Sequence, residues 1–268
     1  MVRLLNQEDR DVVLRFLKKE KEVNLFIIGD IVNFGFDKPF LKLWGEFNQK
    51  NELIAVLLLY YNSFIFYSRE EYSCDEFCKI ISSHNFKTLS GEKSIVENLK
   101  SALNLKKEKT SYLCKWESTQ QIDNKIIPEQ VLQRVKIMDY KNIDDQKLDE
   151  IATLYTTIEE FLNPSSFEQL KQDLLNKSSR IFYIEDDDIV VSTARTAVET
   201  DDLAMVLSVC TLHEYRGKGY ATACMIKLCE VMQSEVKDLC LFYDNPVAGK
   251  IYEKLGFKNI GYWVILNR

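Results

Sequence analysis

The stretch "HEYRGKGYATACM" (213–225) places two cations and two glycines directly before an apolar helical pattern. The run "LAMVLSVCTL" (203–212) comes before it and is typical of a buried strand. A helix is predicted over 220–235, and its inward face carries four residues, Ala221, Met225, Leu228 and Met232. The stretch is therefore a strand-to-helix junction with an unusual local composition.

A junction of this kind binds anions readily. The first N–H groups of a helix have no partner within the helix, and the helix dipole adds partial positive charge at the same end. Gly217 and Gly219 permit a positive φ and remove the Cβ atoms that would hold a ligand away, while Arg216 and Lys218 add charge. The stretch therefore predicts a phosphate-binding loop. The alternative is an ordinary strand–helix turn with solvated cations.

Three phosphate-loop patterns can be distinguished in this stretch. The P-loop pattern GxxxxGK[ST] does not occur in the chain. The dinucleotide pattern GxGxxG fits Gly217 and Gly219, but Thr222 replaces its third glycine, and too little chain follows Asp244 to complete a doubly wound sheet. The third pattern, [QR]xxGx[GA], is satisfied by "RGKGYA" (216–221) at every defined position. Here the sequence resembles the GNAT family of N-acetyltransferases, in the loop that holds the pyrophosphate of acetyl-CoA.

A second stretch extends the resemblance. "NPVAGKIYEKLGF" (245–257) is similar to the family's second signature, with an Asn, a small residue, a Tyr and a closing Gly-Phe. The helix predicted over 220–235 and a strand predicted over 239–244 join the two motifs. The resemblance covers roughly residues 131–268. It implies an α/β fold with a mixed sheet, the GNAT fold, in the C-terminal half.

The resemblance also implies roles for single residues. Acetyl-CoA is the implied co-substrate, held by the strand end and the loop: Val209, Cys210, Thr211, Arg216, Gly217, Lys218, Gly219, Tyr220 and Ala221. Asn245 is expected to bond the pantetheine arm, to cap the helix that Pro246 begins, or both. Tyr252 is expected to be the general acid that protonates the departing CoA thiolate, and its alternative role is a packed aromatic. Gly256 and Phe257 are interpreted as a helix C-cap and its hydrophobic follower.

The implied reaction is direct transfer of an acetyl group to a small-molecule or peptide amine, an acyltransferase activity (EC 2.3.1.-). An amine of the lysine type has a pKa near ~10.4 and must lose a proton before it attacks. Some family members carry a glutamate for this on the strand before the loop, but "AMVLSVCTL" (204–212) contains no carboxylate. Two functions therefore stay open, an N-acetyltransferase and a CoA-binding protein without catalysis.

Other polar residues near the loop are assigned to structure rather than chemistry. Glu199, Asp201 and Asp202 are expected in a solvated hairpin turn, and "EDDD" (185–188) in a second turn rather than a metal site. Cys210 has apolar neighbours, which favour an inert buried thiol over a nucleophile.

Composition narrows the class of protein. The net charge of −6 does not supply the basic face that binding to nucleic acid requires. No signal peptide is apparent at the start, and "LIAVLLLYY" (53–61) is too short for a membrane span and predicts a buried strand. Seven cysteines predict free thiols in a reducing cytoplasm, and only two histidines are present, so no metal site is expected. The oligomeric state is not determined by these features.

The polar, aperiodic segment "ESTQQIDNKIIPEQ" (117–130) predicts a boundary between two parts. We expect an N-terminal lobe over 1–118, a linker over 119–130 and an acetyltransferase domain over 131–268. Both halves run helix, hairpin, helix, strand, which predicts a duplicated fold with a degenerate GNAT-like N-terminal lobe. That lobe would no longer bind CoA and would shape the acceptor cleft; the alternative is an unrelated α+β cap.

Two further local elements are predicted. The hairpin "ELIAVLLLYYNSFIFYS" (52–68) is expected to turn at Asn62–Ser63, and "LQRVKIM" (132–138) is expected to form a strand.

Overall fold

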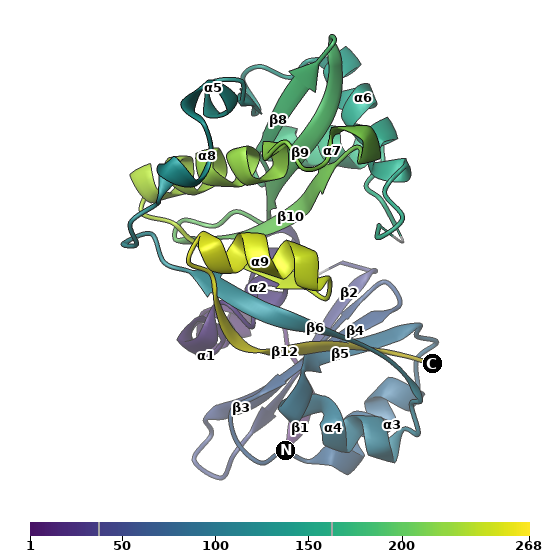
Figure 1. The fold of residues 1–268 in the computed structure, drawn as a ribbon. Helices are drawn as coiled ribbons and strands as arrows, with labels where there is room; N and C mark the ends of the chain where they lie inside the picture. Colours follow the sequence, from purple (N-terminus) through teal and green to yellow (C-terminus); the bar gives the residue numbers. More distant parts are fainter. Residues whose placement is uncertain (37, 162) are drawn as a thin grey trace. The chain divides into compact units, whose positions relative to one another are not determined.

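The computed structural model describes residues 1–36, 38–161 and 163–268, which divide into two compact units. Unit 1 comprises Met1–Leu113, Phe242–Asp244 and Asn259–Arg268, and unit 2 comprises Cys114–Leu241 and Asn245–Lys258. Each unit is a mixed sheet with helices packed on it (Figure 1). Among the described residues, no helix is both long and apolar enough to cross a membrane. The domain boundaries expected from the sequence stay a prediction.

Unit 1 contains strands in the order β1-β2-β3-β4-β5-β12-β6. Their bounds are β1 Val2–Leu4, β2 Leu41–Phe47, β3 Leu53–Tyr60, β4 Ser63–Ser68, β5 Thr88–Glu92, β6 Lys107–Trp116 and β12 Lys258–Asn267. The helices are α1 Arg10–Leu17, α2 Leu25–Phe34, α3 Cys74–Ser82 and α4 Lys93–Ala102. β4 and β5 are parallel, and α3 connects them.

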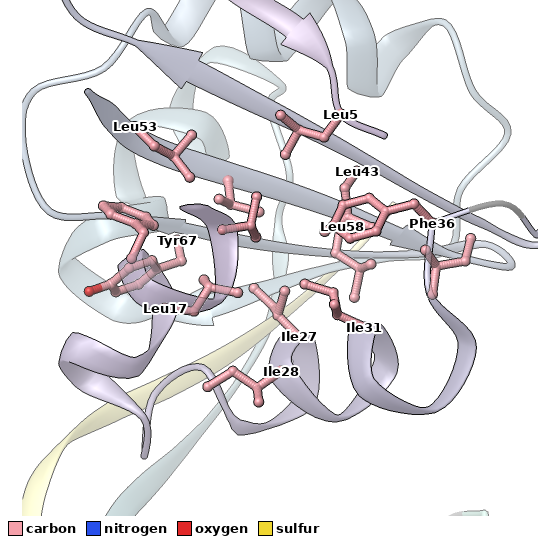
Figure 2. Packing of buried hydrophobic residues seen from close by; sticks show 14 residues of the cluster. Leu5, Leu17, Ile27, Ile28, Ile31, Phe36, Leu43, Leu53, Leu58 and Tyr67 are labelled. Carbon is pink, nitrogen blue, oxygen red and sulfur yellow. The ribbon is translucent and has the colours of Figure 1, made fainter. Parts of the chain in front are cut away.

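β3 is an interior strand of unit 1 and is buried on both faces, as its apolar run predicts. Val56 and Leu58 point into a cluster with residues of α1 and α2, which Figure 2 shows from close by. Leu57 and Leu59 point the other way, into a cluster with residues of α3 and α4. The strand needs apolar side chains at every position because successive residues face opposite helix layers.

Unit 2 contains strands in the order β11-β10-β9-β8-β7. Their bounds are β7 Lys136–Met138, β8 Ile181–Asp186, β9 Ile189–Ala197, β10 Leu203–Thr211 and β11 Asp238–Tyr243. The last three residues of β6 belong to unit 2, and the last two of β11 belong to unit 1. The helices are α5 Glu129–Leu132, α6 Asp145–Thr156, α7 Phe167–Leu175, α8 Tyr220–Ser234 and α9 Pro246–Lys254. β10 and β11 are parallel and are connected by α8, which repeats the arrangement of β4, α3 and β5.

Most predicted elements are confirmed, with differences at two connections. The hairpin between β3 and β4 turns at Tyr61 and Asn62, one residue earlier than predicted, because Tyr60 already pairs with Ser63. The prediction of a strand over 132–138 was wrong in its first half. Leu132 ends α5, which packs against α8, and only the last three residues pair with β8.

The segment 117–130 packs on unit 2. The Gln233 side-chain amide of α8 donates to the Ser118 carbonyl at 2.8 Å and to the Gln120 carbonyl at 2.6 Å. The Ser118 backbone N–H donates to the Asp238 carboxylate at 3.1 Å. These bonds fix the entry into α5 and hold this segment beside α8.

An ion-pair cluster joins β8, the β9–β10 turn and the end of α8. The Arg180 guanidinium donates to both carboxylate oxygens of Glu199, at 3.0 and 2.6 Å, and also pairs with Glu235 at 2.6 Å. Lys237 approaches Glu199 at 3.2 Å. The Glu199 side chain is only 4% exposed, so the expectation that it is solvated was wrong. Two cations replace the lost hydration, whereas Asp201 and Asp202 are exposed as expected.

Glu199→Gln should lower the free energy of unfolding at pH 7 by about 2–3 kcal/mol, since it removes a bidentate, buried pair. Burial alone would raise the pKa of Glu199, but hydrogen bonds from Arg180 and Thr196 lower it below its usual value. The folded-state pKa is therefore below the unfolded one, and the stabilisation is lost as pH falls through the folded value. Urea unfolding at pH 7 and pH 3 measures the difference. An equal effect of the substitution at both pH values would contradict this account.

Candidate functional site

The glycine loop has the backbone geometry that the sequence predicted. After β10, residues His213–Tyr215 form a single 3-10 turn, and Gly217 and Gly219 then adopt φ values of 80° and 81°. α8 begins at Tyr220, and no side chain caps its first turn. The first N–H groups of α8 are thus left available for an anion, at the positive end of the helix dipole.

The two glycines differ in what surrounds them. A Cβ on Gly217 would meet no described atom within 4 Å, so this position requires glycine only for its φ. A Cβ on Gly219 would lie 2.7 Å from Ile127 Cδ1. Ile127 belongs to the segment before α5, and no pattern in the sequence indicated that this segment covers the loop.

The two cations of the loop are exposed and only loosely held. Arg216 donates from Nε to the Thr211 carbonyl at 3.2 Å, and its terminal nitrogen lies 4.0 Å from Glu160. Lys218 lies over the ring of Tyr215, at 4.7 Å from its centroid, and 3.9 Å from Asp186. Both side chains are about half exposed, so they are free to turn toward a phosphate.

A third cation that the sequence analysis missed lies behind the loop. Arg134 donates to the Tyr220 hydroxyl at 2.7 Å and pairs with Asp186 at 3.0 Å. Tyr220 in turn donates to Asp186 at 3.0 Å, and this bond, followed by that of Arg134, lowers the pKa of Asp186. The network anchors the start of α8 to the β8–β9 turn. That turn is where the sequence predicted it, and Asp186 at the end of β8 serves this anchoring.

β10 separates from β11 partway along its length. The two strands pair in parallel only from Leu203 to Val206, opposite Asp238 to Leu241. On its other edge, the pairing of β10 with β9 shifts register between Leu207 and Cys210. Ser208 sits in this bulge with φ 52°, an uncommon conformation for a residue other than glycine. The bulge bends β10 just before Val209, Cys210 and Thr211, whose edge toward β11 is left without a paired strand.

Arg195 of β9 supports the bulge. It is 4% exposed, and its Nε donates to the Ser208 hydroxyl at 3.3 Å. Its terminal nitrogens reach Ser165 at 3.0 Å and Asp173 at 3.2 Å. The Ser208 carbonyl also accepts a hydrogen bond from Thr193 at 2.9 Å. The strained residue is thus fixed from both its side chain and its backbone.

Cys210 is a buried thiol. Burial raises its pKa to about 12, against a smaller opposing effect from the Thr193 hydroxyl at 3.5 Å. A thiol that stays protonated at neutral pH is a poor nucleophile, which agrees with the sequence interpretation. All seven cysteines are free thiols, as predicted.

The second motif forms α9 and its flanks. The Asn245 side chain accepts a hydrogen bond from the Val247 N–H at 2.9 Å and caps the helix, with Pro246 in the first turn. Tyr252 is 6% exposed, and its ring packs edge-on against Phe257 at 5.9 Å. Gly256 ends the helix with φ 89°, as its expected C-cap role requires. The structural role of each residue is therefore visible, and the general-acid role of Tyr252 stays a prediction.

Unit 1 repeats the crossover without the loop. Between β4 and α3 the chain reads "REEYS" (69–73), with two glutamates and no glycine. Tyr72 occupies this connection, packing on Phe66 at 4.6 Å and donating to the Ile95 carbonyl at 2.8 Å. A Cβ on Gly91 would lie 2.6 Å from the Phe66 carbonyl, so the backbones are close where β4 and β5 diverge.

Arg195→Met should lower the free energy of unfolding by about 2–4 kcal/mol, because the hydroxyls of Ser165, Ser179 and Ser208 lose the hydrogen bonds that the buried Arg195 donates. It should also increase amide hydrogen exchange at Ser208 and Val209, since the bulge loses its support. Hydrogen–deuterium exchange followed by mass spectrometry measures the exchange rate of the peptide that contains these residues. Lys171→Met, at an exposed ion pair, is the control, and equal exchange in both variants would disprove the role of Arg195.

Comparisons with known proteins agree with this geometry. Residues 146–257 match the model of the acetyltransferase (GNAT) family. No curated protein sequence matches the chain. A GCN5-related N-acetyltransferase from Sphaerobacter thermophilus has a similar fold, with a TM-score of 0.67 and 16% identity over 100% of this chain and 95% of that one.

Two further structures are similar. A tandem GNAT protein from the clavulanic acid biosynthesis pathway aligns over 100% of this chain and 98% of that chain, with a TM-score of 0.62 and 11% identity. A putative GNAT acetyltransferase from Novosphingobium aromaticivorans aligns over 59% of this chain and 64% of that one, with a TM-score of 0.46 and 18% identity.

The structure of the tandem GNAT protein aligns along the whole chain, which confirms the expected mixed α/β fold with a second GNAT-like lobe in the N-terminal half. The family match, the glycine loop and the separated parallel strands all fall in the C-terminal half. Residues 146–257 are therefore a domain of the acetyltransferase (GNAT) family.

Proposed function

We propose that the chain is an N-acetyltransferase that transfers an acetyl group from acetyl-CoA to a small-molecule or peptide amine. The observation that carries this proposal is that two features occur together: the start of α8 is uncapped, and β10 separates from β11 just before it. The first provides N–H groups for a pyrophosphate, and the second provides backbone groups for amides of a pantetheine arm. An ordinary strand–helix turn would need neither feature.

The residues of unit 2 fit a CoA thioester in their donor chemistry. The N–H groups from Gly217 to Ala221 would hold the pyrophosphate, with Arg216 and Lys218 turning toward it. The edge of Val209, Cys210 and Thr211 would bond the pantetheine amides, with Asn245 beside it. When bound, acetyl-CoA supplies an acetyl group activated as a thioester. In unit 1, Glu70 and Glu71 would repel a phosphate where a loop of this kind would stand, so we expect a single binding site.

Tyr252 is the residue that we propose as general acid. Its packing against Phe257 fixes the ring, and the residue is 6% exposed. The amine would attack directly, because the only cysteine on β10 is a buried thiol with a raised pKa. The free thiols and the absence of a membrane-length helix among the described residues fit a cytoplasmic enzyme.

The second candidate function is CoA binding without catalysis. β10 carries no carboxylate, and Glu199, the nearest acid before it, is occupied by two cations. A screen of acetyl-CoA consumption over amines, aminoglycosides, polyamines and peptides distinguishes the two functions. Turnover with any amine supports the enzyme, and tight CoA binding without turnover supports the binding protein.

Gly219→Asp should abolish acetyl-CoA binding. The substitution forces a side chain into a φ of 81° against Ile127 and brings a negative charge to the pyrophosphate position. Ser234→Asp adds the same charge at the far end of α8 and should bind normally. Calorimetry compares the two. An unchanged dissociation constant for Gly219→Asp would show that the loop does not hold the co-substrate.

Tyr252→Phe should lower kcat by about 10²-fold, the low end of the range for general-acid help, because a thiolate is already a fair leaving group. The acetyl-CoA dissociation constant should stay within about twofold, since the lost interaction acts mainly in the transition state. Stopped-flow and steady-state assays with an amine found in the screen measure both. Tyr262→Phe, at an exposed tyrosine, is the control, and an equal kcat for all three proteins would remove Tyr252 from the mechanism.

A further inference from the structure

Helix α3 of unit 1 (Figure 1) carries two cysteines whose thiols are in contact. Cys74 is the first residue of the helix, and Cys78 follows four positions later, which places both side chains on one face. Their sulfur atoms lie 3.9 Å apart. Both thiols are half-buried, whereas the other five cysteines of the chain are buried. The pair therefore combines close approach of two sulfurs with access to solvent.

The surroundings of the pair are apolar with one acid nearby. Both cysteines pack against the cluster of buried residues to which Phe77 of α3 and Leu99 of α4 belong. Asp75, an exposed residue of the first turn, lies close enough for its negative charge to act on the Cys78 thiol. A cation held between the sulfurs would thus be partly shielded from water and would lie near a carboxylate.

The geometry does not favour a direct bond between the two sulfurs. The Cβ atoms of residues four apart on a helix are separated by about 5–6 Å, whereas a disulfide needs about 3.5–4.5 Å. Burial, followed by the charge of Cys74, raises the pKa of Cys78 to about 12. A thiol that stays protonated at neutral pH reacts slowly in disulfide exchange. A disulfide would therefore require the first turn of α3 to change its conformation.

A metal ion spans the observed distance without such a change. Bonds from thiolate sulfur to a metal are about 2.3 Å long, so two sulfurs on one ion lie about 3.8 Å apart at a tetrahedral angle and about 4.6 Å apart in line. The observed 3.9 Å falls within this range. The two cysteines can therefore act as a preformed pair of sulfur ligands.

The number of ligands decides which metal fits. Structural zinc sites have four protein ligands. In the part of the chain that the structure describes, no three or more His, Cys, Asp or Glu residues gather in a way that could hold a metal ion. Cu(I) is a soft ion that prefers sulfur, and two thiolates satisfy its coordination. The pair therefore fits Cu(I) better than zinc.

We propose that Cys74 and Cys78 bind one Cu(I) ion through their sulfur atoms. Each S–H bond breaks, its electron pair stays on sulfur and forms the bond to copper, and the proton passes to water. Two thiols and Cu⁺ thus give an anionic bis-thiolate complex and two protons, and no oxidation state changes. The site lies within unit 1, and it goes beyond the proposed acetyltransferase function.

The experiment titrates the reduced full chain, without oxygen, into Cu(I) held by the coloured chelator bicinchoninate. The native protein should take up one ion per chain, which the loss of the chelator's colour measures. Cys74→Ser and Cys78→Ser should bind at least about 10²-fold more weakly, since loss of even a supporting residue costs up to about that much. No uptake by the native protein would overturn the assignment, and so would uptake of Zn²⁺ in preference to Cu(I) in a parallel titration.

The matched control is the double variant Cys78→Ser/Lys79→Cys. It keeps two thiols on α3 but moves one of them off the shared face, at an exposed position. This variant should lose Cu(I) as Cys78→Ser does, and thermal unfolding checks that both remain folded. Uptake equal to that of the native protein would show that the ion does not need the adjacent pair, which contradicts the proposal.

Phenylarsine oxide tests the native protein alone, so its result does not depend on the folding of any variant. Its hydrate, PhAs(OH)₂, condenses with two adjacent thiols: two As–O bonds break, two As–S bonds form and two water molecules leave. Mass spectrometry should find a one-to-one adduct on the peptide that contains α3. If no adduct forms there, the two thiols are not available as a pair, and the copper site is ruled out.

Discussion

The bulge at Ser208 is the constraint on which the candidate site depends. Parallel strands that stay paired satisfy their own backbone groups and leave nothing for a ligand. β10 pairs with β11 only as far as Val206, shifts register against β9 after Leu207, and presents its last three residues as an open edge. A strained backbone of this kind persists only when its surroundings fix it. Here a buried arginine and a threonine bond the serine from two sides.

The two units show how much of the site depends on local chemistry rather than on topology. Both place a helix between two parallel strands, and in both the strands pair over only three or four residues. In unit 1 a tyrosine and a phenylalanine pack at the divergence, and the connecting turn carries glutamates. In unit 2 the turn carries two glycines and two cations, and the helix start is uncapped. The same crossover can thus be filled by aromatic side chains, as in unit 1, or remain open to an anion, as in unit 2.

Charge in this acidic protein is arranged in small local groups. Arg134, Asp186 and Tyr220 fix the start of α8, and Arg180 and Lys237 pair with Glu199 in the β9–β10 turn. These buried or half-buried pairs are satisfied within the protein and serve the fold.

The sequence by itself determined the elements whose signal is local. Two glycines between a buried strand and an apolar helix require positive φ values, and Asn245 before Pro246 requires a cap, so the loop and α9 were predictable from a few adjacent residues. The apolar run of β3 likewise predicted burial on both faces. Such features depend on backbone conformation and periodicity, which neighbouring residues decide.

The tertiary structure decided what depends on residues far apart in the chain. Arg134 lies behind the loop through a contact spanning 86 positions, and Arg180 reaches Glu235 across 55. Glu199 was expected to be solvated because its two cations are remote in sequence. Phe26 of α2 packs on Phe242 and Trp263, which come more than 200 positions later. A side chain's burial and charge state depend on such partners, and no local pattern encodes them.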